Sequence, residues 1–294
     1  MTKKALLWVL HPDAERELAA RHSYEVKSAY KRRIEERRKL FEGLSMNDAM
    51  LFVHELDSRY RDYQPVFWCP TKYALERSAA AGLVASVYPA MEVLRVVHDK
   101  RFLSRELSEL CIPGRRVISS LDEWESCRQE TEGPIRTKRP FGYAGKGQRT
   151  WQLAMRKDDR KWLDDSLRQG GFVAEPFLAE AREFSVHGLV DADGVLLGSP
   201  CRLETDQAGA PVSICRLESG GTVTGAPAEE DVQAIGTRVG EALHSAGYFG
   251  AFGIDLLGVG KHFFLVDLNP RFSLGWSIGL GEKRAEALER LLRG

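Results

Sequence analysis

The sequence predicts an α/β protein with separate α+β lobes, on three observations. In the first third of the 294-residue chain, short apolar runs alternate with segments of helical periodicity, which favours a parallel sheet with crossover helices. After residue 171, apolar runs of strand length follow one another, and one amphipathic helix interrupts them. With 43% hydrophobic and 29% charged residues, the chain has the composition of a globular protein that buries sizeable cores.

The first third contributes four predicted strands and a charged helix. The strands are expected at 5–10, 49–55, 65–69 and 84–88. Residues 24–44 are rich in Lys, Arg and Glu, and the run Lys-Arg-Arg-Ile-Glu-Glu-Arg-Arg-Lys at 31–39 allows a basic patch for RNA or acidic substrates. Glu35 and Glu36 interrupt the run and favour a solvated helix of mixed charge, which leaves open a contact with a partner or a second subunit.

The remaining elements follow from the same patterns. Residues 91–110 have a helical pattern, which Cys-Ile-Pro-Gly at 111–114 ends, and a small α+β stretch continues to about residue 170. An amphipathic helix covers 229–246. Further strands are predicted at 172–175, 184–190, 195–198, 249–257 and 263–268.

Charge and cysteine content argue against several classes of function. Lys and Arg total 42 and Asp and Glu total 42, so a net charge of zero offers no general attraction for nucleic acid or an anionic membrane. The apolar stretch near the N-terminus is too short to span a membrane and lacks the cleavage site of a signal peptide. The five cysteines are scattered without metal-ligand spacing, so we expect reduced thiols, no zinc site and a cytoplasmic location.

The strongest chemical signal lies in the last two predicted strands. Asp267 and Asn269 interrupt the apolar run Phe-Phe-Leu-Val-Asp-Leu-Asn-Pro-Arg, and their spacing places them on one face of a strand. Asp255, on the preceding strand across a glycine-containing turn, can face them. Two carboxylates and an amide oxygen suit Mg²⁺, which also takes ligands from substrate phosphates. A solvent-facing hairpin is the alternative, but it explains the interrupted apolar run poorly.

Three weaker signals precede this one. Dense glycines at 142–147, after Lys138, can close backbone N–H groups over phosphates; the segment is neither a Walker loop nor a Rossmann fingerprint, and a mobile surface loop explains it equally well. The segment 173–178 can hold adenine through backbone hydrogen bonds, and Glu183 can hold ribose hydroxyls. Lys100, in the predicted helix, is by composition alone more often a surface residue than a ligand.

Taken in order, these motifs resemble those of the ATP-grasp superfamily over about residues 89–275. The pattern begins with Pro89, Glu92 and Asp99-Lys100, continues with the glycine-rich loop and Glu175-Pro-Phe-Leu, and closes with Asp267-Leu-Asn-Pro-Arg271. The resemblance implies three parts with ATP held between the last two. These are a parallel-sheet pre-ATP-grasp domain at 1–90, a central grasp subdomain with a glycine-rich lid at 91–172, and a C-terminal grasp subdomain with the magnesium-binding strands at 173–294.

The resemblance also implies the cofactors and the role of each site residue. The cofactors are ATP and one or two Mg²⁺ ions, with Mn²⁺ as the alternative ion. Phosphates contact Lys100 and Lys138 under a lid with Gly142, Gly145 and Gly147, adenine contacts Glu175 and the backbone of Phe177, ribose contacts Glu183, and metal binds Asp255, Asp267 and Asn269. Lys138 and Arg271 are the implied catalytic residues, and Arg271 would stabilise the acyl-phosphate and the tetrahedral intermediate.

The implied reaction joins a small-molecule carboxylate to an amine through an acyl-phosphate and releases ADP and phosphate. A small-molecule kinase and a non-catalytic nucleotide-binding protein are the alternatives, and the retained ligand set argues against the latter. Asp267 stands where Glu is more usual, and no lysine lies between 172 and 260, so Arg202 or Arg216 is the candidate to replace a missing phosphate lysine or to bind a substrate carboxylate. We expect no nucleic-acid or membrane partner, and a homodimer stays open.

Overall fold

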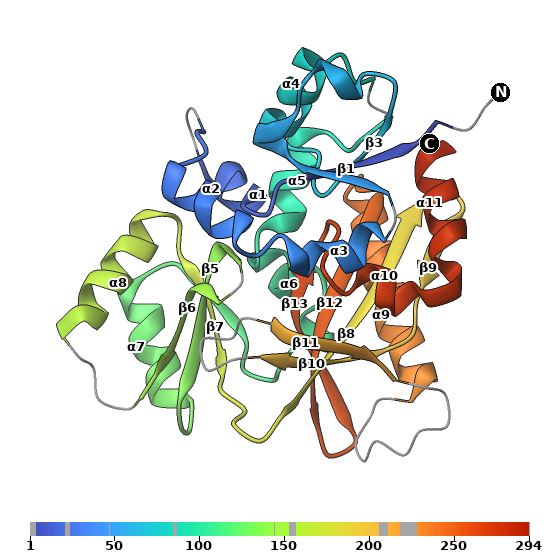
Figure 1. The fold of residues 1–294 in the computed structure, drawn as a ribbon. Coiled ribbons are helices and arrows are strands. Elements are labelled where there is room, and N and C mark those ends of the chain that lie inside the picture. The colour runs from blue at the N-terminus through green and yellow to red at the C-terminus, as the bar shows by residue number, and fades with distance from the viewer. Residues whose placement is uncertain are drawn as a thin grey trace.

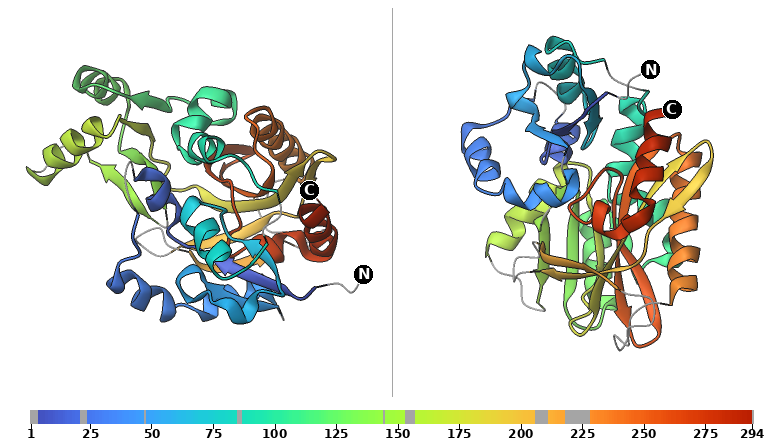
Figure 2. Two further views of the ribbon diagram at one scale, coloured as in Figure 1. Left: turned by 90° about the horizontal axis from the view of Figure 1, so that it is seen from above. Right: turned by 45° about the vertical axis from the view of Figure 1, so that its right-hand side comes forward.

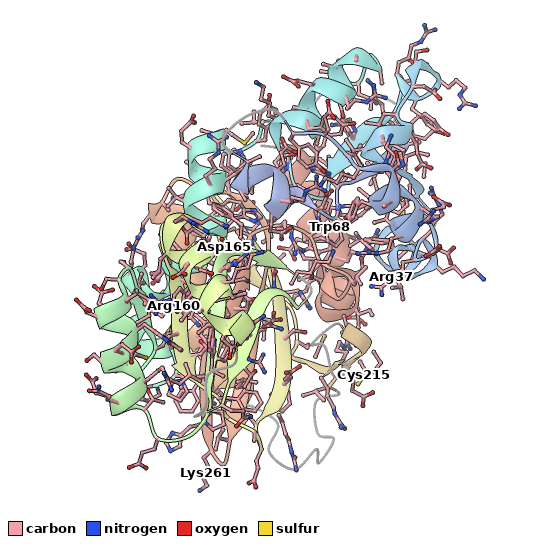
Figure 3. All side chains as sticks on the ribbon, turned by 90° about the vertical axis from the view of Figure 1, so that its left-hand side faces the viewer. Arg37, Trp68, Arg160, Asp165, Cys215 and Lys261 are labelled. Atoms are coloured by element: carbon pink, nitrogen blue, oxygen red, sulfur yellow. The ribbon has the colours of Figure 1, made fainter. Side chains whose placement is uncertain are left out.

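The computed structural model describes residues 4–20, 24–46, 48–84, 87–143, 145–152, 157–205, 211–217 and 228–293. These residues form three β-sheets, and the sheet nearest the N-terminus lies above the other two in Figure 1. No helix in these ranges is long and apolar enough to cross a bilayer. All five cysteines are free, and of these only Cys215 is exposed (Figure 3).

The first sheet is parallel, as predicted, with its strands in the order β2-β1-β3. It comprises β1 (Leu6–Leu10), β2 (Ala49–Phe52) and β3 (Gln64–Phe67), with helices α1 (Ala14–Ala19), α2 (Ser28–Glu35), α3 (Lys39–Ser45) and α4 (Lys72–Ala80), and 3₁₀ turns at Val53–Glu55 and Ser58–Tyr60. The charged segment 24–44 contains two helices rather than one, because residues 36–38 form a turn. The predicted strand 84–88 is wrong at residues 84, 87 and 88. Their side chains are exposed, and no strand among the described residues pairs with them.

The second sheet is antiparallel, with its strands in the order β4-β7-β5-β6. It comprises β4 (Arg116–Ile118), β5 (Ile135–Tyr143), β6 (Lys146–Trp151) and β7 (Phe172–Pro176), with helices α7 (Leu121–Glu130) and α8 (Lys157–Arg168). Trp124, Trp151 and Phe172 pack together in its core.

The predicted glycine-rich loop is the turn of the β5–β6 hairpin. Gly145 and Gly147 have positive φ angles of 76° and 79°, a conformation that L-residues with a side chain rarely adopt. A Cβ atom on Gly142 would lie 2.5 Å from the carbonyl oxygen of Lys146. The glycines are therefore required by the tight turn itself, whatever ligand lies beneath it.

The third sheet has its strands in the order β11-β10-β8-β12-β13, with β9 paired to β8. Its strands are β8 (Arg182–Asp191), β9 (Gly194–Leu197), β10 (Cys201–Thr205), β11 (Pro211–Arg216), β12 (Gly250–Val259) and β13 (His262–Asn269). The helices that accompany it are α5 (Met91–His98), α6 (Arg101–Glu106), α9 (Glu229–Ser245), α10 (Trp276–Leu280) and α11 (Arg284–Arg293), with 3₁₀ turns at Ser108–Leu110 and Gly281–Lys283. The predicted helix 91–110 is thus interrupted at Asp99 and Lys100.

Two buried cores fix the third sheet in place. On one face, α5, α6 and α9 cover apolar side chains of β8 and β12 such as Phe184 and Phe252. A second core joins this sheet to the N-terminal sheet and includes Trp8, Phe272 and Trp276, whose rings pack edge to face. Figure 2 shows the second and third sheets side by side below the N-terminal lobe. The candidate site lies on the face of the third sheet opposite to α5, α6 and α9.

Candidate active site

Neighbouring strands place the predicted metal ligands on one face of the third sheet. Asp255 lies opposite Asp267 in the β12–β13 ladder and opposite Ser185 in the β8–β12 ladder. Asn269 follows Asp267 by two residues, and its amide nitrogen donates to Asp255 Oδ2 at 3.3 Å. The alternate residue Ile254 is fully buried in the helix-covered core. Strand alternation therefore turns the polar residues of β12 and β13 toward the second sheet.

Lys100 comes to these carboxylates from the interruption between α5 and α6. Its Nζ lies 2.5 and 2.6 Å from the two carboxylate oxygens of Asp267. Its backbone N–H donates to the carbonyl of Pro140 in β5 at 2.9 Å, which fixes the interruption against the hairpin. The Lys100 ammonium thus neutralises Asp267.

A buried ion cluster of the second sheet faces the same strand. Lys138 Nζ lies 2.6 Å from Glu175 Oε1 and donates to the carbonyl of Val266 at 2.8 Å. Arg115 Nη1 lies 2.6 Å from Glu175 Oε2 and donates to the same carbonyl at 3.0 Å. Lys138, from the second sheet, and Lys100, from the interruption between α5 and α6, therefore bind consecutive residues of β13, Val266 and Asp267. The second and third sheets join at this point.

Burial and charge set the protonation of the carboxylate pair. Burial first, and then the charge of Asp267, raise the pKa of Asp255 to about 7. Burial acts in the same direction on Asp267, but Lys100 and then Lys138 outweigh it and hold the pKa of Asp267 below its ordinary value. One carboxylate is thus anionic and its neighbour titrates near neutrality. A cation bound beside both would favour ionisation of both.

The donor set of this site fits Mg²⁺. Among the residues that the structure describes, no group of three or more His, Cys, Asp or Glu side chains is placed to hold a metal ion. Two carboxylates and the Asn269 amide are the donors present, and Mg²⁺ commonly uses one or two carboxylates and takes its other ligands from water and substrate phosphates. Phosphates are the groups that Lys100 and Lys138 would attract.

Arg271 is held from the N-terminal lobe. Its Nε lies 2.5 Å from Glu15 Oε1 of α1, its Nη2 donates to Asn269 Oδ1 at 3.2 Å, and its Nη1 donates to the Phe272 carbonyl at 2.9 Å. The guanidinium also lies 5.1 Å from the ring centroid of Trp68, a buried residue labelled in Figure 3. Within the described part of the chain these bonds use three of its five N–H groups and leave two for a ligand.

The predicted nucleotide residues divide between buried and half-buried positions. Glu175 lies in the ion cluster, and Glu183 is on the same face as Asp255, close enough that its charge raises the pKa of Asp255. Phe177 is half-buried, and its backbone N–H donates to the carbonyl of Pro134 at 2.9 Å. Of the two backbone polar groups of Phe177, only the carbonyl is therefore left to bind adenine. The predicted backbone contact with adenine is limited to this one acceptor.

The two predicted substrate arginines lie on opposite faces of the third sheet. Arg202 is opposite Phe184, so it shares the face that the helices cover. Arg216 is opposite Cys201, which is opposite Ser185, and so it belongs to the site face. The structure therefore does not bring Arg202 to Asp255, whereas Arg216 stays a candidate, with its guanidinium against Gly281.

Sequence reasoning missed three residues of the site. Arg115 anchors Glu175, and Glu15 anchors Arg271 while its own Oε2 is buried without a hydrogen-bond partner in the described chain. His187 lies between Ser185 Oγ at 3.2 Å and Ser273 Oγ at 3.1 Å, and burial lowers its pKa to about 4. The contacts with Glu175, Arg271 and Ser273 depend on tertiary structure, and no local pattern marks the three missed residues in advance.

The comparisons with known proteins give different results for the sequence and for the fold. No protein-family model and no curated protein matches the sequence. A solved structure of biotin carboxylase from Campylobacter jejuni in complex with β,γ-ATP superposes with a TM-score of 0.60 at 15% identity, over 98% of this chain and 71% of that one. A D-cycloserine synthetase superposes with a TM-score of 0.62 at 12% identity, over 98% of this chain and 99% of that one.

A third structure, N5-carboxyaminoimidazole synthetase from Staphylococcus aureus complexed with ADP, superposes with a TM-score of 0.55 at 11% identity, over 93% of this chain and 72% of that one. Identities this low show likeness of fold alone. The likeness spans nearly the whole chain, from the parallel N-terminal sheet to the β12–β13 hairpin, and it confirms the predicted architecture. The protein therefore has the ATP-grasp fold.

Proposed function

We propose that this protein is an ATP-dependent ligase that activates a carboxylate as an acyl-phosphate, joins it to an amine, and releases ADP and phosphate. The observation that carries the proposal is the convergence of Lys100, Lys138, Asp255 and Asp267 where the second and third sheets meet. The biotin carboxylase and N5-carboxyaminoimidazole synthetase structures with β,γ-ATP and ADP support a nucleotide in a fold of this kind.

Phosphoryl transfer asks the protein chiefly for positioning and for neutralisation of charge. Lys100 and Lys138 supply two cations whose present partners, Asp267 and Glu175, they would share with phosphate oxygens. Asp255, Asp267 and Asn269 would hold Mg²⁺. The bound ion would neutralise phosphate charge and orient the transferred group.

The remaining groups suit the other parts of the nucleotide and the reacting carboxylate. Glu183, on the same face as Asp255, would bind ribose hydroxyls, and the carbonyl of Phe177 would accept a hydrogen bond from the base. Arg271 lies beside Asn269 with two N–H groups left, and Glu15 fixes its orientation. An arginine held in advance stabilises a developing acyl oxygen without reorganising during the reaction.

The glycine turn of the β5–β6 hairpin is the proposed cover of the phosphates. Pro140, at the base of this turn, accepts the backbone N–H of Lys100, so the cover and a phosphate lysine are connected by a direct hydrogen bond. An acyl-phosphate is readily hydrolysed, and a cover that excludes water would protect it.

The test is a screen of small carboxylates and amines for ADP release in the presence of ATP and Mg²⁺. A ligase of this kind releases ADP and phosphate in equal amounts only when both substrates are present. With the carboxylate alone, hydroxylamine should trap the intermediate as a hydroxamate. AMP as the nucleotide product would overturn the acyl-phosphate route, and a stable phosphorylated product would instead identify a small-molecule kinase.

A further inference from the structure

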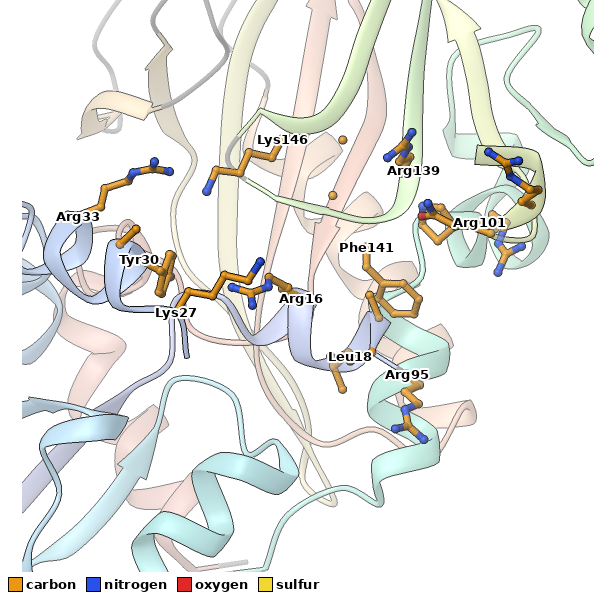
Figure 4. A pocket seen from close by; sticks show the side chains of 18 residues that line it. Arg16, Leu18, Lys27, Tyr30, Arg33, Arg95, Arg101, Arg139, Phe141 and Lys146 are labelled. Atoms are coloured by element: carbon orange, nitrogen blue, oxygen red, sulfur yellow. The ribbon is translucent and has the colours of Figure 1, made fainter. Parts of the chain in front are cut away.

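A cavity of about 1070 Å³ lies between the N-terminal lobe and the β5–β6 hairpin (Figure 4). Of the residues assigned above to nucleotide or metal, it touches only Gly142 and Gly147. Helices α1 and α2 form one wall, the hairpin forms the opposite wall, and residues of α5, α6 and α8 complete the lining. The volume matches the size of pockets that hold small metabolites.

The lining of this cavity is strongly basic. Eight of its 18 lining residues are Arg or Lys, and none of the 18 is Asp or Glu. Figure 4 shows Arg16, Lys27 and Arg33 on the helical wall facing Arg139 and Lys146 on the hairpin. The whole chain has zero net charge, so this concentration of positive charge is local and not a consequence of composition.

Only part of this charge is balanced by carboxylates. Arg16, Arg101 and Arg168 each pair with an aspartate. Four other lining cations have no carboxylate oxygen within 4.0 Å among the described residues: Lys27, Arg33, Arg95 and Arg139. Unbalanced cations that line one cleft attract anions, because the low-dielectric walls of a cleft focus the field.

The direction of the pKa shift of Lys146 also indicates excess positive charge in the cavity. Burial first, and then the positive charges of Arg33, Arg37 and Arg16, lower the pKa of Lys146, with Asp13 acting in the opposite direction. Positive charges from the helical wall are therefore felt on the hairpin wall across the cavity. An anion between the walls would relieve this repulsion.

The cavity adjoins the candidate active site without coinciding with it. Lys138 and Arg139 are consecutive on β5 and extend in opposite directions, Lys138 to Glu175 and Arg139 to Ser166 of α8 at 2.9 Å. Pro140, which lines the cavity, accepts the backbone N–H of Lys100. A molecule in the cavity would therefore have one end next to a proposed phosphate lysine.

We propose that this cavity binds the anionic part of a substrate that carries at least one phosphate or carboxylate group in addition to its reacting group. The inference rests on the proposed ligase function, because it assigns the cavity to a substrate of that reaction. Arginine donates paired hydrogen bonds to phosphate and carboxylate groups, which explains the preference for arginine in the lining.

The experiment uses the full chain with its nucleotide site saturated by ADP and Mg²⁺, and titrates inorganic phosphate and citrate at constant ionic strength. The test variant is Lys27→Glu/Arg33→Glu, at two cavity-lining positions. The matched control is Lys31→Glu/Arg32→Glu, which makes the same charge change at exposed positions of α2 outside the lining. Calorimetry should show saturable binding to wild type and control, and at least about tenfold weaker binding to the test variant.

Three outcomes separate this inference from the proposed function. Equal loss in test and control variants would show diffuse attraction and overturn the cavity assignment. No saturable binding of either anion to wild type that still binds ADP would overturn it as well, and would leave the ligase proposal standing. Cavity-dependent anion binding without any binding of ADP would support the anion site and contradict the ligase.

A second arm identifies the anionic group and the link to catalysis. Serine, O-phosphoserine and glutamate are compared as substrates for ADP release by wild type and by the Lys27→Glu/Arg33→Glu variant. Selective loss of activity with O-phosphoserine would identify a phosphate, and selective loss with glutamate would identify a carboxylate. Should serine be used as well as both anions by wild type, the substrate assignment of the cavity is wrong.

Discussion

Replacing Glu175 by Gln tests the buried ion cluster that joins the second and third sheets. Glu175 lies 2.6 Å from both Arg115 and Lys138, and the three side chains are 3%, 1% and 8% exposed. The neutral amide has nearly the same shape, so the main change is loss of one charge between two buried cations. Removal of one partner of a buried ion pair costs about 3–5 kcal/mol.

The structure indicates how this cost is divided. Burial already lowers the pKa of Lys138 against the opposing effect of Glu175, so Lys138 can release its proton when Glu175 is neutral. Arg115 cannot lose its proton, and its acceptors would then all be uncharged: the carbonyls of Val266 and Lys100, Ser104 Oγ and the amide oxygen of the new Gln. We therefore expect a loss of about 3 kcal/mol in the free energy of unfolding, at the lower end of the range.

The assay is urea denaturation at pH 7, followed by tryptophan fluorescence, because Trp124 and Trp151 lie in the core of the same sheet. Glu130→Gln is the matched control, since Glu130 pairs with Arg116 at 2.8 Å on the surface of the same sheet and is 54% exposed. The control should unfold at the wild-type urea concentration. A Glu175→Gln midpoint equal to that of the control would refute the reasoning.

Three further predictions concern turnover and pH. Asp267→Asn and Asn269→Ala should each reduce turnover by at least about 100-fold while circular dichroism shows a folded protein. Loss of a residue that only hydrogen-bonds to a metal ligand already reduces metal affinity or activity by about 10–100-fold. Near-normal turnover of both variants would mean that neither residue binds metal. Because the pKa of His187 is about 4 when folded and 6.5 when unfolded, the unfolded state binds more protons between these values, and stability is lost as the pH falls through this window. At pH 5 the loss from His187 is about 2 kcal/mol, and His187→Gln should remove it; an unchanged pH profile of urea midpoints would contradict a buried neutral imidazole. Arg216→Ala should raise KM for the substrate and Arg202→Ala should not, because only Arg216 is on the site face. Equal changes of KM in the two variants would show that the face of the sheet on which an arginine lies does not determine whether it binds substrate.

Local patterns in the sequence were sufficient for most of the fold. The alternation of strands and helices predicted the parallel N-terminal sheet, and apolar runs located β7, β8, β9, β12 and β13 to within about two residues. The two-residue spacing of Asp267 and Asn269 predicted their common face, and β12 brought Asp255 opposite Asp267. These features depend on periodicity along one strand or on a short turn.

The errors arose where tertiary contacts decide the outcome. The apolar run 84–88 has strand composition, but in the described part of this run no neighbouring strand satisfies its backbone. Residues 91–110 have one helical period, yet Lys100 leaves it to bond with Pro140 and Asp267. Sequence periodicity reflects contacts within one helix or strand, whereas the structure at these positions depends on contacts with a different element.

The same limit applies to the site. Glu15 reaches Arg271 across 256 positions of sequence, and Arg115 reaches Glu175 across 60. Neither has a motif, because an ion pair between distant elements needs no fixed spacing. Arg202 and Arg216 looked equivalent in sequence, and only the register of β8, β10 and β11 separated them.

The measurement that tests the central claim most directly is a thermal melt of the wild-type protein with ATP and Mg²⁺, repeated with ADP. A ligand that binds only the folded state at 100 times its Kd stabilises it by about 2.7 kcal/mol, which is a clear rise in Tm. We predict this rise for the wild type, its dependence on Mg²⁺, and the loss of that dependence in Asp267→Asn. An unchanged wild-type Tm with both nucleotides, or an equal Mg²⁺-dependent rise in Asp267→Asn, would contradict a nucleotide site built on these residues.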